Sequence, residues 1–295
     1  MNDEFEIAFG TIVGTDHMKT FKNNQDAYAY KSGENYIVAC VADGCGSSKY
    51  SEFGAKFGAN FFVNAVANII QSLSQNDINT LSQKENLRFP YFDDVRLDML
   101  SNMRTLANSM GSDLNQIIND FFLFTMVATV ITPWGTDIVS IGDGYTAVNG
   151  EEFDIEIPKT EDSILQNAPP YVAYNITGSK LYQKESESLK FSLIKSVNTT
   201  LLDSLLIGSD GLSKFEEIQN ENIPGKKEIV GPLSQFWTKD NYFSNTDLIR
   251  RKLFMINKEK VRYDTNLKVL KKYQGLLNDD TTMIVIRRKR SKNSP

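Results

Sequence analysis

Apolar positions in the first 45 residues follow the pattern of β-strands. Residues 6–13, 27–30 and 36–42 form short apolar runs, and each run predicts a strand. The third run is almost wholly apolar and rich in β-forming residues, as expected for a strand buried on both faces. It ends abruptly at Asp43-Gly44-Cys45-Gly46, which is typical of a turn.

The apolar period changes to that of a helix at Ser51. Apolar side chains then recur at four-residue spacing, at Phe53, Phe57, Phe61, Ala65 and Ile69. This spacing predicts an amphipathic helix with Ser51 as its N-cap and Glu52 in its first turn. A polar stretch follows over residues 74–86, and further helices are predicted over residues 93–110 and 113–122.

Strands return in the second half of the chain. Residues 126–132 and 137–141 flank a predicted four-residue hairpin loop, Pro133-Trp134-Gly135-Thr136. Residues 145–148 and 152–157 flank Asn149-Gly150, the strongest short hairpin signal in the sequence. Further strands are predicted over 202–208 and 281–288, separated by a polar, mostly helical region over 233–277.

The hairpins indicate antiparallel pairing, because two strands joined by a tight turn run in opposite directions. No internal repeat and no linker rich in proline, glycine or serine divides the 295 residues. We therefore expect one domain, an antiparallel sandwich with helices packed outside it.

The composition narrows the class of protein. With 32 basic and 37 acidic residues the net charge is −5, which argues against nucleic acid as the main partner. Two cysteines are too few for a disulfide framework and favour a reducing compartment. We see neither an apolar leader nor a run approaching the roughly 18 apolar residues of a membrane helix. The expectation is a cytoplasmic protein without membrane contact.

The signatures of several hydrolase classes are missing. His17 is the only histidine, and no G-x-S-x-G occurs, so a serine hydrolase triad is disfavoured. A zinc site is disfavoured because no cluster of cysteines and further histidines is present, and a P-loop because no G-x-x-x-x-G-K-S/T occurs. Cys45 is a poor candidate for a phosphatase nucleophile, because Asp43 beside it would oppose a thiolate.

Acidic turns instead recur at the boundaries of the predicted strands. They contain Asp26, Asp43, Asp143, Asp210 and the pair Asp279-Asp280. Carboxylates brought together at strand ends repel one another unless cations lie between them, and Mg²⁺ and Mn²⁺ prefer such oxygen ligands. An Asp-Gly pair by itself usually marks only a turn. The residues alone leave a set of turns and a metal site about equally supported.

The order of these motifs resembles the PP2C family of metal-dependent serine/threonine protein phosphatases, over roughly residues 5–288. The matching segments are Asn24-Gln25-Asp26-Ala27, Val41-Ala42-Asp43-Gly44-Cys45-Gly46, Ser140-Ile141-Gly142-Asp143-Gly144, Ile207-Gly208-Ser209-Asp210-Gly211-Leu212 and Asp279-Asp280-Thr281-Thr282. Gly14-Thr15-Asp16-His17 and Gly54-Ala55 look most like a divergent bacterial branch. The resemblance implies an α+β fold, a four-layer α-β-β-α sandwich, with a PP2C-like domain over 1–290 and a basic tail over 291–295.

The resemblance also implies a centre of two Mn²⁺ or Mg²⁺ ions. Asp43 would bridge both ions, the Gly44 carbonyl would bind one, and Asp210 and Asp279 would hold the other. Asp26 would assist from behind the ligands or through water. Asp143 matches a residue that holds a weaker third ion in some relatives.

Departures from the family pattern concern the substrate and the proton donor. Phe21 stands where relatives carry a phosphate-binding arginine, which leaves Lys19 and Lys22 as candidates. Cys45 replaces a histidine of the animal enzymes, and Lys214 replaces an acidic ligand of the third ion. His17 is then a candidate general acid, although a purely structural role in a turn stays open.

The function implied is hydrolysis of phosphoserine and phosphothreonine in proteins, in partnership with a serine/threonine kinase system. The alternative is a catalytically weak or inactive pseudophosphatase that binds phosphoproteins. Basic residues in 233–277 leave two interpretations open, a substrate-docking face and a solvated helix face.

Overall fold

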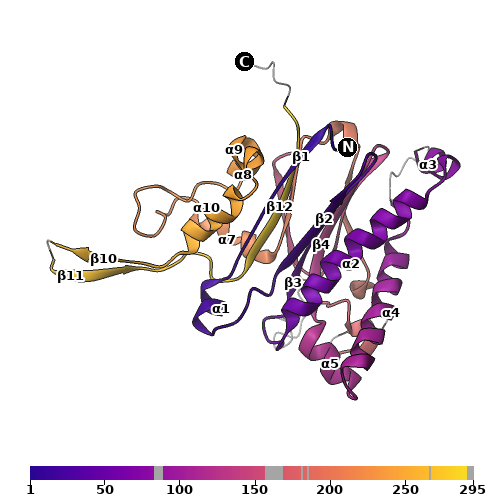
Figure 1. Cartoon of the computed structure of the whole chain (residues 1–295), viewed down its shortest axis with the longest axis horizontal. Coiled ribbons are helices and arrows are strands. Elements are labelled where there is room, and N and C mark those ends of the chain that lie inside the picture. Colours follow the sequence, from indigo (N-terminus) through magenta and orange to yellow (C-terminus); the bar gives the residue numbers. More distant parts are fainter. Residues whose placement is uncertain (83–88, 157–168, 181, 185, 266, 291–295) are drawn as a thin grey trace.

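Two antiparallel β-sheets lie face to face at the centre of the protein, and helices cover both outer faces (Figure 1). The computed structural model describes residues 1–82, 89–156, 169–180, 182–184, 186–265 and 267–290. Sheet 1 has the strand order β1-β12-β9-β6-β7 and sheet 2 the order β2-β3-β4-β5-β8. The predicted four-layer α-β-β-α sandwich is thereby confirmed.

The strands of sheet 1 are β1 (Phe5–Ile12), β12 (Thr281–Arg288), β9 (Ser204–Gly208), β6 (Gly144–Val148) and β7 (Glu151–Ile155). Those of sheet 2 are β2 (Ala27–Ser32), β3 (Ile37–Gly44), β4 (Phe124–Thr132), β5 (Gly135–Ile141) and β8 (Ser192–Val197). A separate ribbon pairs β10 (Lys260–Asp264) with β11 (Val269–Tyr273).

The helices fall into groups on opposite sides of the sandwich (Figure 1). Sheet 2 is covered by α2 (Ser51–Ser72), α4 (Phe92–Met110) and α5 (Leu114–Phe121), with α3 (Gln75–Ser82) beside them. Sheet 1 is covered by α7 (Lys214–Ile218), α8 (Gln235–Thr238), α9 (Asn241–Ser244) and α10 (Leu248–Asn257). Short turns of helix are α1 (Thr15–Lys19), α6 (Tyr174–Thr177), η1 (Glu187–Leu189), η2 (Thr199–Leu201) and η3 (Asp210–Leu212).

Strand β3 shows why its sequence is apolar at nearly every position. Val38, Cys40 and Ala42 pack under the helices, whereas Ile37 and its alternate neighbours pack against sheet 1. Full burial of a valine or isoleucine contributes about 1.5–3 kcal/mol. A one-residue slip would exchange the two faces, so this pattern and its pairing with β4 fix the position of Asp43 at the strand end.

The structure corrects the prediction for Ser51. Tyr50 occupies the N-cap position of α2, and Ser51 lies in the first turn. Its hydroxyl donates to the Cys45 carbonyl (2.9 Å) and contacts the Gln25 amide nitrogen (2.6 Å). A buried hydroxyl is normally hydrogen-bonded, and these two contacts satisfy that of Ser51. Through them Ser51 holds the turn after β3 in place.

Other differences concern the more polar segments. The prediction of a mostly helical region over 233–277 is wrong for 260–273, which form the β10–β11 ribbon. Strand β8 was not predicted, and neither was α3, although Ser74 and Asp77 cap each other's backbone N–H groups there. The loop between β4 and β5 is shorter than the predicted four residues, since Thr132 pairs with Gly135. Residues 83–88, the strand end predicted at 157 and the tail at 291–295 lie outside the described residues.

No helix in the described ranges is long and apolar enough to cross a membrane.

Candidate metal centre

The acidic turns meet where the chain passes between the two sheets. Residues 13–26 lead from β1 in sheet 1 to β2 in sheet 2, and residues 142–143 lead back from β5 to β6. The ends of β3 and β9 and the start of β12 lie at the same edge. Side chains from five distant segments are therefore presented by rigid strand ends.

A cavity of about 230 Å³ opens at this edge. Its lining includes most of the site residues predicted from the sequence, namely His17, Asp43, Gly44, Asp143, Asp210 and Asp279. Asp26 is buried and does not line the cavity, although its charge acts on Asp43. Cys45, Thr125, Pro169 and Tyr171 complete much of the wall. The sequence analysis did not single out the last three, none of which is acidic.

Asp43 carries the strongest electrostatic conflict in the cavity. Burial raises the pKa of its carboxyl well above the ordinary value, and the charges of Asp26, Asp210, Asp279 and Asp143 raise it further. Such a cluster is costly for the protein alone, since like charges at close range disfavour ionisation. Divalent cations between the carboxylates would remove that cost.

Two carboxylate oxygens in this cluster have no hydrogen-bond partner in the part of the chain that the structure describes. They are Oδ1 of Asp26 and Oδ1 of Asp210, both buried. The other oxygen of Asp26 accepts a hydrogen bond from the Ser209 hydroxyl (2.7 Å), which anchors that side of the carboxyl. Buried carboxylate oxygens are normally paired or coordinate a metal. The donor set thus fits hard divalent cations.

Asp143 lies in the short connection between the sheets. Gly142 has φ +83°, and a Cβ on Gly144 would lie 2.3 Å from Cγ2 of Val127, so only glycine fits on either side. The tight crossing places the carboxyl at the cavity wall. Burial, followed by the charge of Asp210, raises the pKa of Asp143 to about 6.

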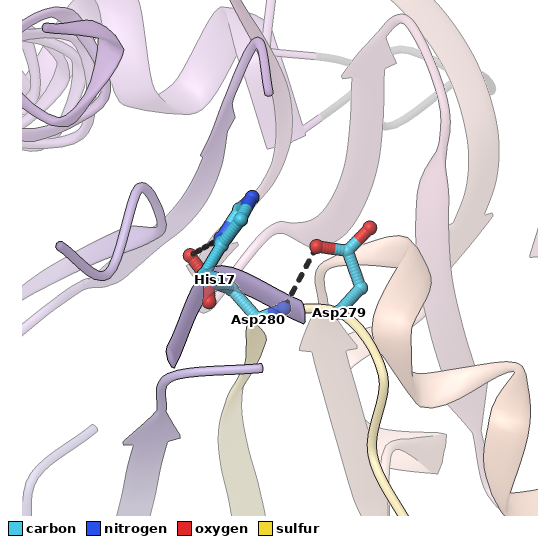
Figure 2. Close-up of side chains that lie close together, drawn as sticks. All are labelled: His17, Asp279 and Asp280. Carbon is cyan, nitrogen blue, oxygen red and sulfur yellow. Dashed lines mark hydrogen bonds and ion pairs between the residues drawn. The ribbon is translucent and has the colours of Figure 1, made fainter. Parts of the chain in front are cut away.

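His17 and the Asp279-Asp280 pair form a second cluster at the cavity wall (Figure 2). Oδ2 of Asp280 lies 3.0 Å from Nδ1 of His17. The same carboxyl accepts hydrogen bonds from the backbone N–H groups of Gly14 (2.7 Å) and Gln25 (2.6 Å). The second ring nitrogen of His17 points away from Asp280 (Figure 2). Asp280 therefore orients the histidine, a role that the sequence analysis did not assign to it.

The two lysines considered for phosphate binding both lie outside the cavity lining. Lys19 pairs with Asp16 at 2.8 Å, and the Lys22 ammonium donates to the Gly46 carbonyl at the cavity rim. Phe21, which stands at the family's arginine position, is 96% exposed and adopts φ 57°. Among the described residues that line the cavity, none is lysine or arginine.

Cys45 has a different environment from that of a cysteine nucleophile. Its Sγ lies 3.1 Å from Oγ of Ser47. Burial opposes ionisation of the thiol, but hydrogen bonds from Ser47, Tyr171 and Ser48 outweigh burial and lower its pKa. A thiolate that attacks phosphate also needs a cationic cradle, and the described lining supplies no arginine for one.

Comparison with known proteins places this geometry in a family. A family model described as protein phosphatase 2C matches residues 13–249. The fold is similar to that in the crystal structure of a bacterial serine phosphatase, with a TM-score of 0.54 and 15% identity over 98% of this chain and 99% of that chain. It is also similar to the serine/threonine phosphatase Stp1 from Staphylococcus aureus, with a TM-score of 0.50 and 14% identity over 97% and 96% of the chains.

A search of curated protein sequences found no match. The family model nevertheless covers most of the chain, and the two-sheet architecture agrees with it. The protein therefore belongs to the protein phosphatase 2C family.

Proposed function

We propose that this protein is a phosphatase that hydrolyses phosphoserine and phosphothreonine in proteins at a centre of two Mn²⁺ or Mg²⁺ ions. The observation that carries the proposal is the convergence of aspartates from four segments on one cavity, with Asp26 buried behind them. Asp26 and Asp210 each have a buried carboxylate oxygen without a hydrogen-bond partner among the described residues. Carboxylates packed this closely raise one another's pKa and disfavour the ionised form. Perturbed pKa values of this kind are typical of functional sites, and bound cations would favour the ionised carboxylates.

Different residues of the cavity would bind the different ions. Asp43 and the Gly44 carbonyl would bind on one side, and Asp210 and Asp279 on the other, with Asp26 supporting Asp43 from behind. Asp143 is positioned for a further, weaker ion. When bound, the ions would supply an activated water and stabilise the charge that develops on phosphorus.

The remaining residues act on the substrate. Asp280 fixes the His17 ring so that Nε2 faces the Gly46 turn, where an added Cβ would lie 3.8 Å from that nitrogen. From there His17 would protonate the leaving serine or threonine alkoxide. Lys22, held against the Gly46 carbonyl at the rim, would contact phosphate oxygens as a point charge.

A pseudophosphatase remains the second candidate, supported by one observation. No lysine or arginine is found among the described lining residues, so the substrate phosphate lacks the usual bidentate partner there. Such a protein would bind phosphorylated partners of a serine/threonine kinase system without turnover.

The deciding experiment measures hydrolysis of p-nitrophenyl phosphate and a phosphothreonine peptide with Mn²⁺, with Mg²⁺ and with EDTA. We expect metal-dependent turnover of both substrates, lost in Asp43→Asn. Asp94→Asn is the matched control, because Asp94 is an exposed aspartate in the first turn of α4, on the helical layer. Absence of turnover with either metal in folded protein would reject the enzyme and favour the pseudophosphatase. Turnover that survives EDTA would reject the metal mechanism.

A further inference from the structure

The β10–β11 ribbon projects away from the body of the protein (Figure 1). We call residues 259–273 the arm. Every residue of β11 is exposed, and the middle of β10 is exposed as well. An isolated two-stranded ribbon is only marginally stable in water, so an arm of this kind needs an explanation.

The two faces of the arm differ. On one face, Lys260 and Arg262 lie over the Gly225 turn, where an added Cβ would be 2.8 Å from Cδ of Lys260. The pairing register puts Val261, Tyr263 and Leu270 on the opposite face. These three side chains are 52%, 59% and 70% exposed. Lys272, which pairs with Val261, lies on this face as well, so the outward face is apolar apart from one lysine. Exposed apolar clusters of this kind mark sites of association.

The arm is also positively charged on an acidic protein. It contains five basic residues and two acidic ones, whereas the whole chain has a net charge of −5. Lys271 pairs with Asp264 and Lys272 with Glu259, each at 2.7 Å. Lys260, Arg262 and Lys268 make no ion pair with any described residue. Charge complementarity therefore favours an acidic partner.

The arm offers backbone groups as well as side chains. Its sheet consists of β10 and β11 alone, so the outer edge of each strand has no strand partner in the described part of the chain. An open edge can pair with an extended segment of another protein, with backbone hydrogen bonds giving affinity and alternate side chains giving specificity. An extended peptide fits these edges better than a lipid surface does.

The base of the arm is tied to the two segments that lead to His17 and Asp279 in the candidate metal centre. Asn257, buried at the end of α10, donates to the Val13 carbonyl (2.7 Å) and accepts from the Leu277 backbone N–H (3.1 Å). Asp279, which lines the cavity, follows Tyr273 by only six positions in the chain. At roughly 3.3–3.6 Å per residue, the arm begins within about 20 Å of that aspartate.

From these features we infer that the arm is a docking site for an acidic, extended segment of the phosphoprotein whose phosphorylated residue enters the cavity. The inference rests on the proposed phosphatase function for its biological use, but the binding itself does not. The apolar outward face would hold alternate apolar side chains of the segment, while Arg262 and Lys268 would attract its carboxylates.

The test uses the full chain and an unphosphorylated, fluorescein-labelled 15-residue peptide of alternating acidic and β-branched residues, followed by fluorescence anisotropy. Two arm variants are compared with the unaltered protein, Val261→Ser/Tyr263→Ser/Leu270→Ser and Arg262→Glu/Lys268→Glu. We expect each to weaken binding by roughly tenfold or more. The charge-reversed arm should in turn gain affinity for a peptide in which lysines replace the acidic residues.

Lys56→Glu/Arg104→Glu is the matched control, because it makes the same change in net charge at exposed positions on the helical layer over sheet 2. It should leave peptide binding unchanged. Equal binding by the arm variants and the unaltered protein would overturn the inference. So would arm-dependent binding to phosphatidylserine vesicles without peptide binding, or concentration-dependent dimerisation that the apolar triple variant abolishes.

Hydrolysis of p-nitrophenyl phosphate separates this inference from the proposed function. That small substrate cannot reach both the arm and the cavity, so we expect the arm variants to hydrolyse it at the normal rate. Peptide binding without any metal-dependent hydrolysis would reject the phosphatase and leave the docking site standing. Metal-dependent hydrolysis without arm-dependent peptide binding would reject the docking site and leave the phosphatase standing.

Discussion

Asp279 and Asp280 are neighbours in the chain, yet only Asp279 lines the cavity, while Asp280 is 2% exposed and holds His17 at 3.0 Å. The Asp280 carboxyl also joins the loop at Gly14 to the start of β2 through two backbone hydrogen bonds. Asp279 thus presents its carboxyl to the cavity, and Asp280 is committed to the structure around it.

This division predicts different consequences for the two substitutions. Asp280→Ala leaves two buried backbone N–H groups without an acceptor, which should lower the free energy of unfolding by about 2–5 kcal/mol. Asp279→Ala should cost much less stability and should still reduce metal-dependent hydrolysis. Urea denaturation in EDTA together with hydrolysis assays measures both. Equal loss of stability in the two variants would contradict the assignment.

Asp43→Asn should separate activity from stability. It removes a carboxylate whose pKa is raised well above its ordinary value by burial and by the surrounding aspartates. We expect a loss of metal-dependent hydrolysis of at least about 100-fold, because Asp43 is the carboxylate that would hold the ions in the proposed centre. The same substitution should raise the thermal midpoint of the metal-free protein, since it relieves repulsion. A lower midpoint in EDTA would show that repulsion at Asp43 does not limit the stability of the metal-free protein.

The stability of the metal-free protein should fall as the pH rises. Unfolded aspartates ionise near pH 4, whereas burial and then the charge of Asp210 raise the pKa of folded Asp143 to about 6. The stability that protonated Asp143 contributes to the folded protein is fully present below about pH 4 and is lost as the pH rises through 6. This loss lowers the free energy of unfolding by on the order of 2 kcal/mol. Burial and neighbouring carboxylates raise the pKa of Asp26 and Asp43 in the same direction.

Thermal unfolding in EDTA between pH 5.5 and 7.5 measures this dependence. Asp143→Asn should make the slope shallower, and saturating Mn²⁺ should remove it, because bound cations favour the ionised carboxylates. A metal-free protein that becomes more stable toward pH 7.5 would count against the carboxylate cluster as the controlling feature.

The role of His17 should depend on the leaving group. A serine or threonine alkoxide needs a proton as it departs, whereas p-nitrophenolate does not. His17→Gln should therefore lower kcat for a phosphothreonine peptide by about 100-fold or more and change kcat for p-nitrophenyl phosphate far less. Equal effects on both substrates would indicate a structural role, or one in binding phosphate.

Much of the fold could be predicted from local patterns. Runs of apolar residues defined β3 and β12 because both strands are buried on two faces, and Asn149-Gly150 defined a hairpin because both residues adopt positive φ there. The ribbon at 260–273 was missed because its exposed, lysine-rich strands bury little apolar surface and so lack that signal.

For the candidate site, the sequence by itself determined which aspartates stand at strand boundaries, since a turn after an apolar strand is a local property. Only the tertiary structure decided that these boundaries share one edge, that Asp280 turns inward to Gly14, Gln25 and His17, and that Lys19 and Lys22 lie outside the cavity lining. Those relations join residues up to 266 positions apart. Strand pairing and sheet packing create them, and no local pattern carries that information.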